Sequence, residues 1–158
     1  IVGPIEKLPA SLPVALMAGA ADTSIGLPSA RALAARLCGR AAERRVLFVF
    51  PSDSHDGRVI KAGHGSPGAP DTRYDFPDSH GAVPERIGAR AGFEPSASLN
   101  TLDFYGYWKV VDGVFDWVAT GRYPEEVFGG GEDARFLGLW PDGTPYSPAR
   151  IEDPCGGA

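Results

Sequence analysis

The sequence has no long apolar run, no excess of positive charge and very little sulfur. No apolar run approaches the roughly 20 residues that a membrane-spanning helix needs. The net charge of −5 offers no basic surface to a phosphate backbone, so nucleic acid is not an expected partner. Cys38 and Cys155 are too few for a disulfide scaffold, and they can pair only if their Cα atoms lie within about 7 Å. The cellular compartment is therefore left open.

The composition is that of one globular domain. A chain of 158 residues with 43% hydrophobic and 22% charged residues has enough apolar content for a core and is short for two domains. Its 21 glycines and 15 prolines are concentrated in residues 63–95 and 129–158, which predicts that regular structure lies elsewhere. We therefore treat residues 1–158 as a single unit.

Two short apolar runs flank a segment with helical periodicity. Residues 12–18 are almost wholly apolar and bounded by Pro and Gly, which favours a strand buried on both faces. Residues 27–38 repeat apolar side chains at helical spacing, with Pro28 suited to a first helical turn. Residues 46–50 form a second apolar run of β-branched and aromatic side chains. This order predicts a βαβ unit over residues 12–55, with parallel strands.

The remainder of the chain divides into one strong helix and two irregular stretches. Residues 98–121 predict a long helix that ends at Gly121, and its core-facing stripe is expected to consist of Leu102, Tyr105, Trp108, Val111, Phe115 and Val118. Residues 56–97 show no clear periodicity and predict an irregular excursion draped over the domain. Residues 122–158 form a tail with few regular signals, in which 136–140 favour a short edge strand.

The ends of the two predicted strands carry a pattern known from one enzyme family. The first strand and the turn after it match a form like P-V-L-x-x-x-G-x-x-D at Pro13, Val14, Gly19 and Asp22. The second strand is followed by Pro51 and, four residues later, by His55. The order and spacing resemble the C-terminal third of an α/β-hydrolase, in which an acid and then a histidine follow the last two strands.

The resemblance implies an α/β fold. It would be the C-terminal part of an α/β-hydrolase parallel sheet, with the βαβ unit, a long irregular insertion and the long C-terminal helix. The resemblance also implies that Asp22 and His55 are the catalytic acid and histidine of a Ser-His-Asp triad. His55 would take the proton of a serine, and Asp22 would orient the imidazole and stabilise its charged form.

The nucleophile of that family is missing from the sequence. Its G-x-S-x-G elbow precedes the acid, whereas the nearest string here, residues 63–68, follows the acid and lacks a glycine two residues before Ser66. We therefore expect a fragment of a serine hydrolase that acts on a small-molecule ester or amide and is inactive alone. Its expected partner is the missing N-terminal part of the hydrolase domain.

Alternatives exist for both site residues. Asp22 has a second possible role as a turn or helix-cap residue, because aspartate is common after a strand. His64 and His80 lie in the excursion, and either could fold back over the strand ends. The position of His55 directly after a buried strand favours it, because rigid elements place catalytic groups best.

A second class of function is a non-catalytic binding or association module. Carboxylates lie among the histidines of the excursion, and together they could bind a metal ion that stabilises the module. These carboxylates are Asp53, Asp56, Asp71, Asp75 and Asp78. No recognised ligand spacing appears among them, so neither a metal site nor a cofactor is predicted. A small βαβ unit also leaves sheet edges and apolar helix faces open, which calls for a partner.

Overall fold

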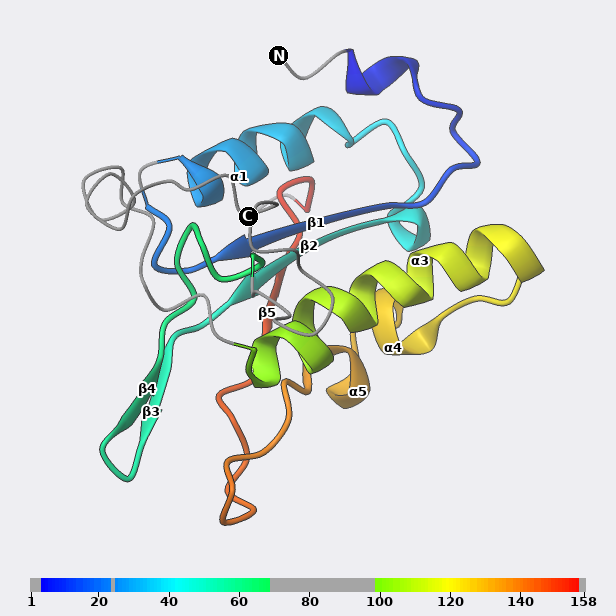
Figure 1. The fold of residues 1–158 in the computed structure, drawn as a ribbon. Helices are drawn as coiled ribbons and strands as arrows, with labels where there is room; N and C mark the ends of the chain where they lie inside the picture. The colour runs from blue at the N-terminus through cyan, green and yellow to red at the C-terminus, as the bar shows by residue number, and fades with distance from the viewer. Residues whose placement is uncertain (1–3, 24, 69–98, 157–158) are drawn as a thin grey trace, which may run out of the picture.

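The computed structural model describes residues 4–23, 25–68 and 99–156 (Figure 1). A central sheet has the longest helices on its two faces, with α1 on one side and α3 on the other. The strands are β1 (Val14–Gly19), β2 (Arg45–Phe50), β3 (Asp53–His55), β4 (Arg58–Ile60) and β5 (Arg150–Glu152). The helices are η1 (Ile5–Lys7), α1 (Gly26–Arg36), η2 (Ala42–Arg44), the π-helical turn η3 (Asp103–Trp108), α3 (Lys109–Thr120), α4 (Glu125–Phe128) and α5 (Glu132–Arg135). His80 lies outside the described residues.

The strand–helix–strand unit is present. β1 and β2 pair in parallel, with Val14 opposite Arg45 and Gly19 opposite Phe50, and α1 connects them. Both strands therefore end at the same edge of the sheet, next to the turn that contains Asp22. The predicted parallel pair is confirmed, and the bounds of α1 and β2 lie close to those expected from the sequence.

The prediction of an α/β-hydrolase parallel sheet is wrong. In the described residues β5 runs antiparallel to β2, so the three-stranded sheet β1-β2-β5 is mixed, and β3 and β4 form a separate antiparallel pair. β5 has only three residues, too short to show a pattern in a tail rich in Gly and Pro. The expected edge strand at 136–140 is reduced to one bridge between Leu139 and Pro145.

The hairpin β3–β4 replaces the start of the expected irregular excursion. Its turn is Asp56-Gly57, and both residues have positive φ, 47° and 73°. Asp-Gly is a preferred sequence for the two-residue turn that matches the twist of a hairpin. The hairpin projects away from the three-stranded sheet (Figure 1), and it moves His55 away from the end of β2.

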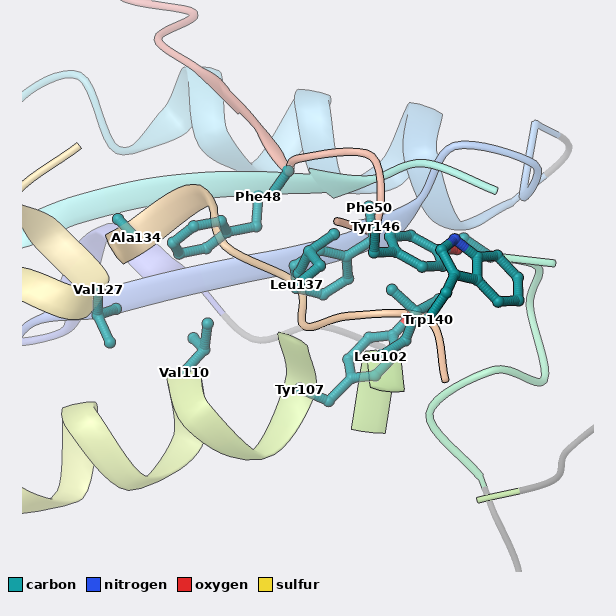
Figure 2. Packing of buried hydrophobic residues seen from close by; sticks show 12 residues of the cluster. Phe48, Phe50, Leu102, Tyr107, Val110, Val127, Ala134, Leu137, Trp140 and Tyr146 are labelled. Atoms are coloured by element: carbon teal, nitrogen blue, oxygen red, sulfur yellow. The ribbon is translucent and has the colours of Figure 1, made fainter. Parts of the chain in front are cut away.

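The core is divided between the two faces of the sheet, because successive side chains of a strand point to opposite sides. Leu47 and Val49 pack with α1, whereas Phe48 and Phe50 face the other side. That second side holds the larger cluster, which Figure 2 shows between the sheet, the long helix and the tail. Its other buried members are Ala62, Leu102, Tyr107, Val110, Val127, Ala134, Leu137, Trp140, Tyr146 and Ala149.

The long helix buries a different face from the one predicted. Leu102, Tyr107, Val110 and Trp117 are buried, whereas most of the predicted core stripe is exposed. We call the open side the exposed helix stripe; it runs at steps of four and three through Phe104, Trp108, Val111, Phe115 and Val118. The apolar side chains of α3 form a broad face opposite Lys109, Asp112 and Asp116, and only part of that face is buried. The π-helical turn η3 also shifts the register of the side chains, so periodicity could not identify which part faces the core.

A disulfide closes the domain. Cys38, just after α1, is bonded to Cys155, just after β5, with 5.4 Å between their Cα atoms and a sequence separation of 117. A bidentate ion pair between Arg31 of α1 and Glu152 of β5 lies alongside it. The helix on one face is thereby fixed to the strand at the edge of the sheet.

We expect loss of the disulfide to destabilise the fold, because a cross-link over so long a loop restricts the unfolded chain. The double variant Cys38→Ser/Cys155→Ser should lose about 2–4 kcal/mol of unfolding free energy. This corresponds to a fall in Tm of roughly 5–15 °C, measured by calorimetry. A reductant should produce the same fall in the wild type and none in the double variant. An unchanged wild-type Tm after complete reduction would contradict the pairing.

Candidate functional site

Asp22 lies where β1 turns into α1. Its side chain is 7% exposed, and its carboxylate accepts hydrogen bonds from the backbone N–H groups of Ile25 and Gly26 at the start of the helix. Gly26 is needed at this point, because a Cβ there would lie 2.0 Å from Asp22 Oδ2. The helix-cap role weighed for Asp22 is therefore part of its structure.

The same carboxylate binds a histidine. His64 Nδ1 lies 2.7 Å from Asp22 Oδ2, and the imidazole side chain is 47% exposed. An ionised carboxylate only accepts hydrogen bonds, so Nδ1 carries the proton and donates it to Asp22. The arrangement is a half-exposed imidazole oriented by a buried acid, in which the second ring nitrogen, Nε2, lies on the side of the ring away from this bond.

Backbone contacts hold the segment before His64 against the end of β1. Ala21 N–H donates to the carbonyl of Ala62 at 3.0 Å, and Ala62 N–H donates to Ser52 Oγ at 3.0 Å. Gly19 permits this approach, since a Cβ there would lie 2.1 Å from the Ala62 carbonyl oxygen. A glycine at the last position of β1 therefore allows a residue more than 40 positions away to reach the acid.

The pKa of Asp22 lies below its ordinary value of 3.8. Burial of the carboxyl raises its pKa. The hydrogen bonds from Gly26, His64 and Ile25, together with the charge of protonated His64, lower the pKa by more than burial raises it. Asp22 is thus ionised at neutral pH, as an acid that orients a histidine must be.

His55 does not meet Asp22. Its Nε2 lies 2.7 Å from Asp142 Oδ2, and its ring stacks obliquely on Trp140 with 5.7 Å between centroids. The pKa of Asp142 is lowered to about 2. The largest cause is a hydrogen bond from the backbone N–H of Thr144, and the second is the hydrogen bond from His55. The expected Asp22–His55 contact is therefore replaced by two separate pairs, Asp22–His64 at the sheet edge and His55–Asp142 at the hairpin.

Ser66, two residues after His64, is engaged elsewhere. Its hydroxyl donates to the carbonyl of Gly63 at 2.8 Å and lies 2.7 Å from the Tyr107 hydroxyl oxygen. Ser66 is also buried. A buried hydroxyl whose proton is given to a carbonyl is poorly placed for attack on a substrate, so Ser66 supports the turn that carries His64.

Within residues 4–23, 25–68 and 99–156, no three His, Cys, Asp or Glu side chains come together in a group that could hold a metal ion. In the same ranges, none of the helices has both the length and the apolar character required to cross a bilayer.

Comparison with known proteins finds no match: no family model fits the chain, and neither a curated protein nor a solved structure matches it. The function must therefore be argued from the site itself.

The contact between Gly26 and the carboxylate provides a test of the site. We expect Gly26→Ala to displace Asp22 and raise its pKa toward 3.8 or above, as measured by carboxyl ¹³C NMR during an acid titration. A lowered folded-state pKa means that ionised Asp22 stabilises the fold above its unfolded pKa, and that this stabilisation is lost as the pH falls through the folded value. Gly26→Ala should therefore reduce stability at pH 7 more than at pH 2.

Gly39→Ala is the matched control, because a Cβ at Gly39 meets nothing within 4 Å. An Asp22 pKa that is the same in both variants and in the wild type would show that the carboxylate does not lie against Gly26.

Proposed function

We propose that this chain supplies the acid and the histidine of a Ser-His-Asp relay in a serine hydrolase that acts on esters. The supporting observation is the 2.7 Å contact between Asp22 Oδ2 and His64 Nδ1, with the acid buried and the imidazole half-exposed. His64 takes the role that the sequence pattern assigned to His55. The proposal concerns this pair of residues and does not depend on a parallel sheet.

The chemistry follows from the orientation of the imidazole. As a serine oxygen attacks the ester carbonyl carbon, Nε2 of His64 accepts the hydroxyl proton and the ring becomes positively charged. Asp22 stabilises that charge through the bond to Nδ1. When the bond from carbon to the leaving oxygen breaks, His64 returns the proton to the leaving alcohol. Water then attacks the acyl carbon and gives a proton to His64 Nε2. The bond from that carbon to the serine oxygen breaks as His64 returns the proton to the serine, which releases the acid product.

The serine is proposed to come from another part of the hydrolase polypeptide. The sequence holds no G-x-S-x-G string, and the serine nearest to His64, Ser66, is buried and bonded to Gly63 and Tyr107. A relay without its nucleophile has no hydrolytic activity, so we expect the isolated chain to be inactive.

The apolar surface beside β1 is a second observation in favour of a partner polypeptide. β1 is an outer strand of the sheet β1-β2-β5. Beside it lies a groove of about 300 Å³ lined by residues with apolar side chains: Leu8, Leu12, Pro13, Val14, Ala15, Met17, Val110, Val111, Val114 and Phe115. The exposed helix stripe continues this surface. So much open apolar surface is typical of an interface, and we propose that the part of the hydrolase carrying the serine covers it.

The same surface is the observation that favours the second function, a non-catalytic association module. The two functions differ in the importance of the Asp22–His64 pair. An association module would need the exposed stripe and would tolerate loss of the histidine, whereas a hydrolase would need both.

The test uses the full-length gene product and an activated ester such as p-nitrophenyl acetate. Asp22→Asn and His64→Ala should each lower kcat/KM by about 10³- to 10⁴-fold, because loss of a triad member removes most of the catalysis. His55→Ala is the matched control, since His55 also pairs with an aspartate, and its kcat/KM should stay within about twofold of the wild type.

Two results would contradict the proposal. One is loss of activity in His55→Ala with retention in His64→Ala. The other is ester turnover by the isolated 158-residue chain that His64→Ala abolishes, which would place a nucleophile within the chain.

A further inference from the structure

His64 lies in a tight turn that two hydrogen bonds between Ser66 and Gly63 hold together. Ser66 N–H reaches the carbonyl of Gly63 at 3.3 Å, and Ser66 Oγ donates to the same oxygen at 2.8 Å. The residue before His64 and the residue two positions after it are thus bonded to each other. The direction of the imidazole depends on how firmly this turn is held.

Tyr107 of the π-helical turn η3 contacts this turn through its hydroxyl group. Its hydroxyl oxygen lies 2.7 Å from Ser66 Oγ, and both side chains are buried. Because the proton of Ser66 goes to the Gly63 carbonyl, Tyr107 donates its own proton to Ser66 Oγ. The result is a directional chain of hydrogen bonds from Tyr107 through Ser66 to Gly63, the neighbour of His64.

Tyr107 is protonated and rigidly placed. Burial raises the pKa of its hydroxyl; the bond with Ser66 opposes this rise, and the charges of Asp103 and Asp22 add to it. Its ring packs edge-on against Phe50, the last residue of β2, with 4.8 Å between centroids. Figure 2 shows Tyr107 and Phe50 in the cluster that joins the helix to the sheet.

The π-helical turn makes this contact available. A π-helical turn adds a residue to the helical repeat and redirects the side chains around it, and such turns are frequent at functional sites. Gly106 lies against the core, where a Cβ would make ordinary van der Waals contacts with the Phe50 ring at 3.4 Å and with Leu137 at 3.5 Å. Tyr107 is therefore directed at the His64 turn by a local feature of the helix.

We propose that Tyr107 is a positioning residue, which acts through Ser66 and the Gly63 carbonyl to hold His64 in line with Asp22. The inference rests on the proposed function of the Asp22–His64 pair and adds a buried tyrosine that supports the position of His64. Tyr107 makes no proposed contact with substrate. Its effect is to limit the freedom of the turn, so that the bond from Nδ1 to Asp22 stays formed while Nε2 exchanges protons.

The experiment compares Tyr107→Phe with Tyr105→Phe in this chain. Tyr107→Phe removes one hydroxyl and keeps the ring on Phe50, whereas Tyr105 is an exposed tyrosine of the same helical turn that packs on Phe136. The readout is the far-downfield ¹H resonance of the His64 Nδ1 proton and its exchange with water. Tyr107→Phe should speed this exchange about tenfold or more, and Tyr105→Phe should leave it unchanged.

Ser66→Ala removes the middle of the chain of hydrogen bonds and provides a second variant should Tyr107→Phe fail to fold. It should give the same faster exchange, and the double variant should add little, because both substitutions break one pathway. In the full-length gene product, Tyr107→Phe should lower kcat about 10- to 100-fold with little change in KM, as expected for a displaced catalytic group.

The outcomes separate this inference from the proposed function. If Tyr107→Phe and Ser66→Ala exchange the Nδ1 proton as slowly as the wild type, or retain wild-type kcat while His64→Ala is inactive, the positioning role is wrong and the relay stands. If the wild type has no Nδ1 resonance that depends on Asp22, or if His64→Ala remains active, the relay itself is wrong and the inference falls with it.

Discussion

The hydrogen bond between Asp22 and His64 is the interaction on which the account of this protein depends. One buried carboxylate ends the turn after β1, accepts the first amide protons of α1 and orients an imidazole from a distant loop. Leaving such a carboxylate buried without partners would cost several kcal/mol, on the order of 3–5. The surrounding structure is accordingly built to satisfy it, with glycines at positions 19 and 26 where a side chain would collide with the approaching groups.

The domain has two contrasting regions. At the C-terminal ends of β1 and β2, hydrogen bonds join Asp22 to His64 and join the backbone of Ala62 to Ala21 and Ser52. Along the outer edge of β1 and the exposed helix stripe, apolar side chains are open to solvent. The disulfide and the ion pair between α1 and β5 fix the opposite edge of the sheet. The proposed relay would need further polypeptide to supply the serine, and the apolar surface along β1 is where we propose that it packs.

The sequence was sufficient to predict the parts whose signals are local. Apolar runs located β1 and β2, and the spacing after the first run placed Asp22 in the turn that follows β1. The partner of Asp22 could not be predicted in the same way, because it depends on where a loop folds back. His55 was favoured because a histidine directly after a strand is held by that strand. The Asp56-Gly57 turn, a hairpin signal that lay within the supposed irregular excursion, carries His55 away to Asp142.

The most direct test is the tautomer of His64, measured by long-range ¹H–¹⁵N NMR on the neutral side chain. We expect the single proton of the neutral ring to lie on Nδ1, where Asp22 Oδ2 accepts its hydrogen bond at 2.7 Å, and the ring nitrogens of His64 to respond to the titration of Asp22. A proton on Nε2 of His64, together with a response of His55 in its place, would contradict it.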